Sequence, residues 1–266
     1  MEKKQRNLNA AAKAKKDEFY TQLTDIEKEM RYYRKHFRGK TILCNCDDPF
    51  ESNFFKYFVL NFNRLGLTKL IATCYSTSPI MGSQLHYHFD EHGQMSFSFG
   101  DTSRDDGVKH PYKAVVKQVY DKTGDGGVDM LDVVELFKSG ENELSELSGD
   151  GDFRSPECLS LLDEADIVVT NPPFSLFREY ISTLMEHRKS FIIIGNVNAI
   201  TYKEFFPLLK ENKVWIGASI HSGDRKFYVP DDYPLSAAGC GIDEEGRRFI
   251  RVKGVRWYTN LDIKQR

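Results

Sequence analysis

The stretch that most restricts the backbone conformation is 166–174, Asp-Ile-Val-Val-Thr-Asn-Pro-Pro-Phe. The apolar, β-branched run at 167–169 is typical of a strand that is buried on both faces of a parallel sheet. Two prolines follow, and because proline cannot donate to a sheet, the strand ends at Asn171. Apolar residues then recur at helical spacing over 176–185. The stretch predicts a strand, a loop and a helix, with Asn171 at the strand's carboxyl end, where open α/β sheets bind ligands.

An earlier stretch has the same pattern. It predicts a strand at 41–46, a helix capped by Ser52 and a second strand at 69–74, and further strands are predicted at 191–195 and 214–217. At 266 residues the chain can bury one large core, with room for an insertion or a second lobe. We therefore predict an α/β fold with a doubly wound, mostly parallel sheet, a β-rich insertion and a small C-terminal β lobe.

The chain divides into three parts. Residues 1–40 are expected to form a basic arm and an N-terminal helix, which we place at about 25–37. Residues 41–217 are expected to form the α/β domain that carries the site. Its alternation of strands and helices is interrupted at about 76–147, where short polar segments and glycines predict a β-rich or irregular insertion. Short strands in 218–266 predict the small β lobe.

Three finer predictions concern local structure. Within the interruption, 114–120 is expected to be a strand and Met130–Lys138 a helix. Further on, Thr201 and Glu204 have the spacing of a capping box, which predicts that a helix begins there. Pro207 is expected to kink that helix, because a proline in a helix interior removes a hydrogen bond.

Composition is that of an ordinary globular protein, with 40% hydrophobic residues, 29% charged residues and a net charge of -2. No apolar run approaches the roughly 20 residues that span a bilayer, and no signal core follows the start, so we expect a cytoplasmic protein with no membrane partner. The five cysteines form no CxxC pair and predict reduced, structural thiols. Basic runs at 1–16 and 246–256 are candidate phosphate contacts, and a solvated basic face explains either run equally well.

Residues 121–132 fit the calcium-loop template in part, with Gly126 at the turn. The template has an acid at its third position and a glutamate at its twelfth, whereas this chain has Thr123 and Asp132. The interpretation that we favour is a turn rich in Gly and Asp, in which Asp129 caps the following helix.

The sequence lacks the motifs of several other kinds of functional site. His86, His88 and His92 have a spacing that zinc accepts, but no cysteine is patterned around them, so we expect a solvated loop and predict no metal. The sequence holds no GxGxxG or GxxxxGK[ST] phosphate loop, no GxSxG elbow and no HExxH helix. A Pro-Cys nucleophile, which carbon-5 cytosine methylation needs, is absent as well.

The Asn-Pro-Pro-Phe loop has the chemistry of a clamp for an amino group on a ring. The lone pair of an adenine amino group is delocalised into the ring, so this nitrogen is a poor nucleophile. The side-chain oxygen of Asn171 and the carbonyl oxygen of Pro172 would accept its two N–H bonds and favour a pyramidal nitrogen that attacks a methyl sulfonium. Pro173 stiffens the loop, and Phe174 would stack on a base flipped out of the duplex.

At this point several blocks closely resemble the EcoRI-type adenine-specific DNA methyltransferases. They cover nearly the whole chain apart from about 76–147 and are far more specific than Asn-Pro-Pro-Phe alone. The resemblance implies the Rossmann-like fold of S-adenosylmethionine-dependent methyltransferases, that methyl donor, and double-stranded DNA as partner in a restriction-modification or phage setting. The blocks are Lys-Asp-Glu-Phe-Tyr-Thr (16–21), Cys-Asn-Cys-Asp-Asp-Pro (44–49) followed by Ser-Asn-Phe-Phe-Lys-Tyr-Phe (52–58), Gly-Asp-Gly-Asp-Phe-Arg-Ser (149–155), residues 166–180, Asn-Val-Asn-Ala-Ile-Thr-Tyr-Lys-Glu (196–204) and Trp-Tyr-Thr-Asn-Leu-Asp (257–262).

The resemblance also implies roles for residues at matching positions. The first block would hold the amino-acid end of the cofactor, and the second would form the cofactor loop after the first strand. The third would place an acid on the amino group of the cofactor's adenine and an aromatic ring beside it, and the fourth would hold the target base. These residues are Phe19, Tyr20 and Thr21, then Asn45 and Asp47, then Asp152 and Phe153, and finally Asn171, Pro172, Pro173 and Phe174.

Three features depart from the family's pattern. The usual glycine-rich cofactor loop is replaced by 44–49, and no acid ends the second predicted strand, which leaves the ribose partner unassigned. Relatives continue past the block at 257–262, so we expect the target-recognition region to be incomplete here. A protein-glutamine or RNA methyltransferase with the same clamp, or an inactive binding module, is the alternative. The recognised bases and the oligomeric state stay open, and a monomer is compatible with the sequence.

Overall fold

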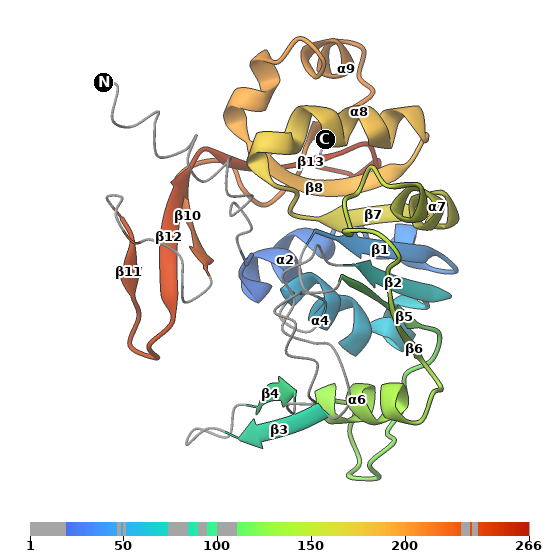
Figure 1. Ribbon diagram of the computed structural model, residues 1–266. Helices are drawn as coiled ribbons and strands as arrows, with labels where there is room; N and C mark the ends of the chain where they lie inside the picture. Colours follow the sequence, from blue (N-terminus) through green and yellow to red (C-terminus); the bar gives the residue numbers. More distant parts are fainter. Residues whose placement is uncertain are drawn as a thin grey trace.

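The computed structural model describes residues 20–46, 49, 52–73, 111–229, 235 and 239–265, together with the backbone of 85–89 and 95–99. Within these residues, helices cover both faces of a central sheet (Figure 1). None of the helices in the described part of the chain has the length and apolar character needed to cross a membrane.

The central sheet has eight strands in the order β6-β5-β2-β1-β7-β8-β13-β9. Its four middle strands are parallel, whereas β5, β6, β13 and β9 each pair antiparallel with their neighbours at the two edges. The predicted doubly wound, mostly parallel sheet is therefore confirmed. The strands are β1 (Thr41–Asn45), β2 (Lys69–Thr73), β5 (Tyr112–Val116), β6 (Glu143–Glu146), β7 (Ile167–Thr170), β8 (Ser190–Asn196), β9 (Trp215–Ile216) and β13 (Val255–Thr259).

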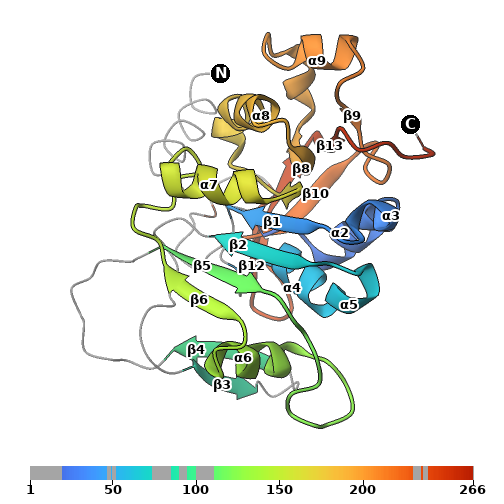
Figure 2. The same ribbon diagram turned by 90° about the vertical axis from the view of Figure 1, so that its right-hand side faces the viewer.

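Alternate residues of each middle strand enter two separate cores, because successive side chains of a strand point to opposite faces. Ile42 and Val169 join the core beneath α2, α4 and α6, while Leu43 and Val168 join the core beneath α7, α8 and α9 (Figure 2). This is why the middle strands are apolar without interruption. The helices are α2 (Leu23–Met30), α3 (Arg34–Phe37), α4 (Asn53–Leu60), α5 (Phe62–Leu65), α6 (Met130–Lys138), α7 (Pro156–Glu164), α8 (Phe177–Glu186) and α9 (Phe206–Lys210).

The two predicted β-rich regions contribute to more than one sheet. In the C-terminal region, β10 (Asp224–Tyr228), β11 (Gly241–Ile242) and β12 (Arg248–Lys253) form a separate antiparallel sheet at the side of the molecule (Figure 1). The last strand of that region, β13, returns to the central sheet instead. In the interruption, β3 (Leu85–Phe89) and β4 (Met95–Phe99) form a hairpin, whereas β5, α6 and β6 extend the central fold.

Local predictions fail where the chain turns between elements. The predicted strand at 114–120 lies two residues earlier at its start, as β5, and the helix at 25–37 is divided into α2 and α3. The capping box at Thr201 is wrong, because this residue ends a 3-10 turn and its hydroxyl donates to the carbonyl of Asn198. Pro207 lies in the first turn of α9 rather than kinking a helix, and a first-turn proline needs no hydrogen-bond partner.

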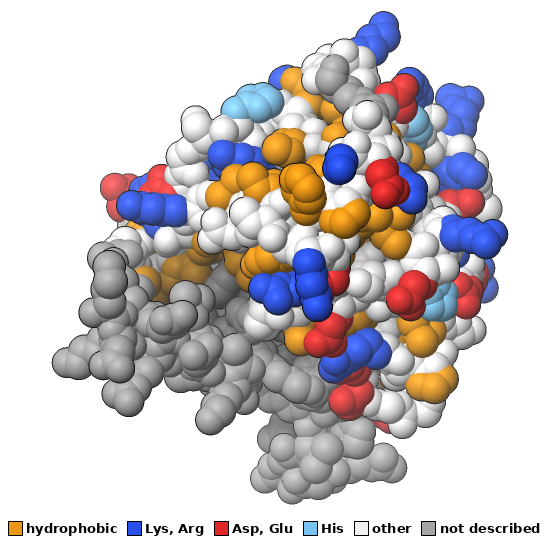
Figure 3. Space-filling view, turned by 90° about the horizontal axis from the view of Figure 1, so that it is seen from above, with side chains coloured by type: hydrophobic (Ala, Val, Ile, Leu, Met, Phe, Trp, Pro, Cys, Tyr) orange, Lys and Arg blue, Asp and Glu red, His pale blue; other side chains and the backbone are white. Residues whose placement is uncertain are grey.

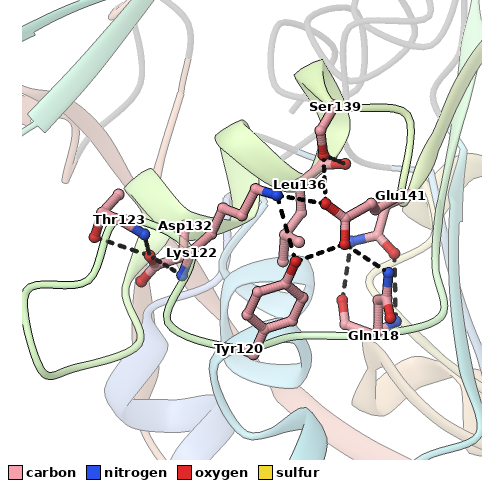
Figure 4. A network of polar contacts seen from close by, with 9 residues as sticks. Gln118, Tyr120, Lys122, Thr123, Asp132, Leu136, Ser139 and Glu141 are labelled. Atoms are coloured by element: carbon pink, nitrogen blue, oxygen red, sulfur yellow. Dashed lines mark hydrogen bonds and ion pairs between the residues drawn. The ribbon is translucent and has the colours of Figure 1, made fainter.

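The acidic loop before α6 holds its carboxylates with its own backbone (Figure 4). Asp129 caps α6, as predicted, and it also forms a capping box with Asp132, which was not predicted. The buried carboxylate of Asp132 accepts hydrogen bonds from the backbone N–H of Lys122, Thr123 and Asp129 at 2.8–2.9 Å, and Asp121 accepts from two glycine N–H groups. No group of three or more metal-ligating side chains occurs in the described residues, and the histidines at 86, 88 and 92 lie outside the described side chains.

The face formed by α8, α9 and the chain between them combines apolar and basic side chains. Seen from this side, hydrophobic groups gather near its centre with Lys and Arg around them (Figure 3). Ile200 and Phe206 are among the large apolar residues exposed there, at 37% and 54% of their surfaces. Exposed apolar surface of this kind is common on globular proteins and by itself identifies no partner.

Candidate active site

The candidate site lies where the winding of the sheet reverses. From β1 the chain proceeds to β2 on one side of the sheet, and β7 lies against β1 on the other side. Ligands of open α/β folds bind at such a switch point, beside the carboxyl ends of the strands. The two strand ends contact each other, because the Thr170 hydroxyl donates to the backbone carbonyl of Asn45. The predicted position of Asn171 at the carboxyl end of a buried strand is therefore confirmed.

The Asn-Pro-Pro-Phe loop leaves β7 and leads directly into α8. Asn171 is almost fully buried, with 3% of its surface exposed, and Pro172 is buried beside it. Phe174 is half-buried and packs against the larger core, and it begins a short 3-10 turn, Phe174–Leu176. The protein thus fixes the Asn171 amide by packing before any ligand arrives.

The end of β1 forms the second wall of the site. The side-chain oxygen of Asn45 accepts a hydrogen bond from the hydroxyl of Tyr180, a buried residue of α8. The next residue, Cys46, has a φ of 87°, the left-handed region that favours glycine. Cys46 thus adopts a backbone conformation that a glycine would adopt without strain.

Burial raises the pKa of Tyr180 well above its usual value, and the neighbouring Cys46 thiol acts in the same direction. The hydrogen bond with Asn45 acts in the opposite direction but does not overcome burial. The hydroxyl of Tyr180 accordingly keeps its proton near neutral pH and remains a donor to Asn45.

Tyr20 and Thr21 are held by two contacts, one with β10 and one with the start of α4. Tyr20 forms a backbone bridge with Tyr228 of β10, with an N–H to carbonyl distance of 2.9 Å. The Asn53 amide, at the start of α4, donates to the carbonyl of Thr21 at 2.7 Å. Thr21 is buried, and its hydroxyl has no hydrogen-bond partner within the part of the chain that the structure describes. A buried hydroxyl of this kind is suited to a polar group of a ligand.

Asp152 and Phe153 lie in the loop before α7. Phe153 packs edge-on against the ring of Tyr180, with ring centroids 5.0 Å apart, which joins this loop to the end of β1. The Asp152 carboxylate pairs with Arg154 at 2.7 and 2.9 Å, and the same arginine bonds Glu179 of α8. Hydrogen bonding to Asp152 raises the pKa of Arg154, so this arginine stays charged. A ligand amino group would share Asp152 with Arg154.

With this geometry established, comparison with known proteins identifies the family. The profile of a family described as "Adenine-specific methyltransferase EcoRI" matches residues 7–266. The chain belongs to this methyltransferase family. Among its relatives, the Type II methyltransferase M.EcoRI of Escherichia coli is 43% identical over 263 residues. Type II methyltransferases of Mycoplasma genitalium (M.MgeORF184P) and Mycoplasma pneumoniae (M.MpnI) are 34% and 32% identical.

These alignments cover 96–97% of this family member but only 68%, 65% and 65% of the three relatives. The chain therefore spans about two thirds of the length of the relatives it matches. No solved structure matches it significantly.

The structure brings most of the residues expected for this family to one edge of the sheet. Asn45 is the last residue of β1 and Asn171 follows the neighbouring strand β7. Phe153 is joined to that edge through Tyr180, and Thr21 bonds the start of α4, the helix that comes after β1 in the chain. Phe19 and Asp47 lie outside the described residues, as does the segment after β2 where a ribose partner would be sought. Sequence reasoning missed Tyr180, because its helical spacing with other apolar residues assigned it to the core of α8.

Proposed function

We propose that this chain is a site-specific DNA methyltransferase that transfers a methyl group from S-adenosylmethionine to the exocyclic amino nitrogen of an adenine in double-stranded DNA. The setting proposed is restriction-modification, which the Type II names of its relatives support. The observation that carries the proposal is the buried Asn171 at the switch point of the sheet, in a chain that matches an adenine-specific family over residues 7–266. Because its substrate is cellular DNA, we place the protein in the cytoplasm.

The catalytic task of the loop is to hold the target nitrogen in a reactive geometry. We assign the Asn171 side-chain oxygen and the Pro172 carbonyl as acceptors for the two N–H bonds of the adenine amino group. Two rigid acceptors stabilise a pyramidal nitrogen more than the planar ground state, which lowers the barrier by differential binding. The methyl donor, when bound, supplies an electrophilic methyl group. Phe174 would stack on the flipped base, a contact worth about 1–3 kcal/mol.

The residues present fit the methyl donor. Its amino-acid end carries a carboxylate, and the buried Thr21 hydroxyl is a donor without a partner in the described residues. Asn45 can hold a polar group at the end of β1, and Phe153 supplies an apolar ring in the loop before α7. We assign these residues, with Tyr20 and Asp152, to cofactor binding, and the same proposal includes Phe19 and Asp47 on sequence alone.

A DNA-contacting surface is proposed on the outer face of the three-stranded sheet. Phe227 and Ile250, which lie opposite each other in this sheet, enter the core, so the residues next to them along each strand face outward. Lys226 lies opposite Arg251 in the register, and the sequence adds Lys253 two residues further. Arg251 and Lys253 are exposed and are available to phosphates. This sheet is proposed as part of the target-recognition region.

The experiment that tests the activity offers the protein three acceptors. With tritium-labelled S-adenosylmethionine, we expect label in duplex DNA and none above background in RNA or protein. Label that enters only RNA or protein would refute the DNA assignment. Cofactor binding without transfer to any acceptor would identify an inactive binding module instead.

A further inference from the structure

Tyr180 connects parts of the candidate site that are far apart in sequence. Its hydroxyl donates to the side-chain oxygen of Asn45, which is 135 residues away. Tyr180 is fully buried and lies on α8, the helix that directly follows the catalytic loop. Its hydroxyl is therefore shielded from solvent and bonds a group of the protein.

This hydrogen bond fixes which end of the Asn45 amide faces a ligand. An amide has one acceptor oxygen and one NH2 group with two donors. The oxygen of Asn45 is bonded to Tyr180, and its backbone carbonyl is bonded to the hydroxyl of Thr170. With both oxygens of Asn45 engaged by β7 and α8, the NH2 group is the part left to meet a ligand at the switch point.

The ring of Tyr180 makes the second connection. It contacts Phe153 at a centroid distance of 5.0 Å and an interplanar angle of 66°. Edge-to-face ring pairs have a preferred geometry and hold each other in position. Tyr180 consequently contacts both walls assigned to the cofactor, one through its hydroxyl and the other through its ring.

We propose that Tyr180 is a positioning residue that orients the Asn45 amide so that its NH2 group donates to S-adenosylmethionine. The inference rests on the proposed function, because it requires that this edge of the sheet binds the methyl donor. Without the hydroxyl, the amide of Asn45 rotates between two orientations, and one of them presents an acceptor where the ligand needs a donor.

The first test compares Tyr180→Phe with Tyr258→Phe by calorimetry with S-adenosylmethionine. Both changes remove one buried hydroxyl and keep the ring, and the Tyr258 hydroxyl bonds the carbonyl of Asn196 at 3.0 Å. We expect Tyr180→Phe to weaken cofactor binding about five- to tenfold, the scale of one hydrogen bond, and Tyr258→Phe to change it less than twofold. In steady-state kinetics, KM for the donor should rise in the first variant while KM for DNA stays unchanged. Equal cofactor affinity in wild type and Tyr180→Phe would overturn the inference.

A double-mutant cycle separates positioning from general support of the fold. Once Asn45 is alanine, removing the Tyr180 hydroxyl should weaken binding no further, because the group it orients is gone. Additive losses would contradict the inference. Asn45→Asp provides a measurement that does not need a folded Tyr180 variant, because it keeps an acceptor for Tyr180 but replaces the NH2 group. We expect this variant to bind S-adenosylmethionine at least tenfold more weakly. Unaltered affinity would overturn the inference. If the wild-type protein itself binds no S-adenosylmethionine, the proposed function fails rather than the role of Tyr180.

Discussion

Asn171 is the residue on which the proposed chemistry depends. Its amide follows β7 and is held by burial, so its orientation is set before a base arrives.

The first prediction concerns catalysis. We expect Asn171→Ala to lower kcat about 100-fold or more, because an acceptor that acts in the transition state is removed. The measurement is methyl transfer to duplex DNA under saturating donor. Asn61→Ala is the control, since this amide bonds the Tyr57 carbonyl at the other end of α4, and it should retain activity within about threefold. Near-normal transfer by Asn171→Ala would remove this residue from the mechanism.

The second prediction concerns the strained turn after β1. At Cys46, with φ of 87°, glycine should be more stable than alanine by about 1 kcal/mol in the free energy of unfolding. The matched position is Cys44, inside β1, where glycine should be less stable than alanine by about 0.5–1 kcal/mol. Urea unfolding of the four variants measures both differences. If alanine is more stable than glycine at Cys46 as well as at Cys44, the backbone of Cys46 is not strained.

Among the elements, the loop before α6 is a turn whose carboxylates accept hydrogen bonds from its own backbone. Asp132 accepts three backbone N–H bonds and one from the Thr123 hydroxyl, and Asp129 caps the helix. Burial would raise the pKa of Asp132, but the bonds from the backbone N–H of Asp129 and Thr123 lower it overall. The Asp132 carboxylate is thus charged and serves as the hydrogen-bond acceptor for the backbone N–H groups of the loop.

We expect Asp132→Ala to lower the free energy of unfolding by about 2–4 kcal/mol, because three backbone N–H groups and the Thr123 hydroxyl lose the buried carboxylate that accepts their hydrogen bonds. Asp129→Ala should cost about 1 kcal/mol, the usual effect of removing an N-cap. Chemical denaturation of both variants gives the comparison. Equal losses would show that Asp132 acts as a cap residue only.

Adding calcium tests the metal interpretation of the same loop. Because the carboxylates are already engaged by backbone N–H groups, we expect the thermal unfolding midpoint to be the same with millimolar calcium and with chelator. A ligand that binds the folded state raises the midpoint. A calcium-dependent rise that Asp125→Ala abolishes would establish a calcium site there.

Glu141 provides a pH test of the neighbouring network (Figure 4). Hydrogen bonds from Lys122 first, and then from Tyr120 and Ser139, lower its pKa to about 2. A lowered pKa stabilises the fold above the unfolded pKa of about 4.5, and this contribution is lost as pH falls from about 4.5 to about 2. The unfolding midpoint in urea should therefore fall less steeply over that range in Glu141→Gln than in wild type. If the urea midpoint falls equally steeply with pH in Glu141→Gln and in wild type, the lowered pKa of Glu141 does not contribute to stability.

At the scale of the whole molecule, local signals predicted the central elements and missed the long-range contacts. The β-branched run and the two prolines were sufficient to place Asn171 at a strand end. The bridge between Tyr20 and Tyr228 and the bond between Tyr180 and Asn45 join residues far apart in sequence, and no periodicity marks them. For the same reason the return of β13 to the central sheet was missed, since its sequence pattern fits a strand of either sheet, and its pairing with β8 and β9 is a long-range contact.

The proposed DNA surface is tested by salt dependence. We expect Arg251→Gln with Lys253→Gln to weaken DNA binding and to reduce the slope of log affinity against log salt by about 2, one for each phosphate that the variant no longer neutralises. Lys210→Gln with Lys213→Gln, near the C-terminal end of α9, is the control and should leave the slope unchanged. An unaltered slope in the first pair would place the DNA elsewhere.

The most direct measurement is mass spectrometry of nucleosides from duplex DNA that has been incubated with the protein and isotopically labelled S-adenosylmethionine. The clamp at Asn171 predicts labelled adenosine methylated on its exocyclic amino nitrogen, at a fixed sequence, and at least 100-fold less of it with Asn171→Ala. Label found on cytosine, or adenine methylation that persists in Asn171→Ala, would contradict the account.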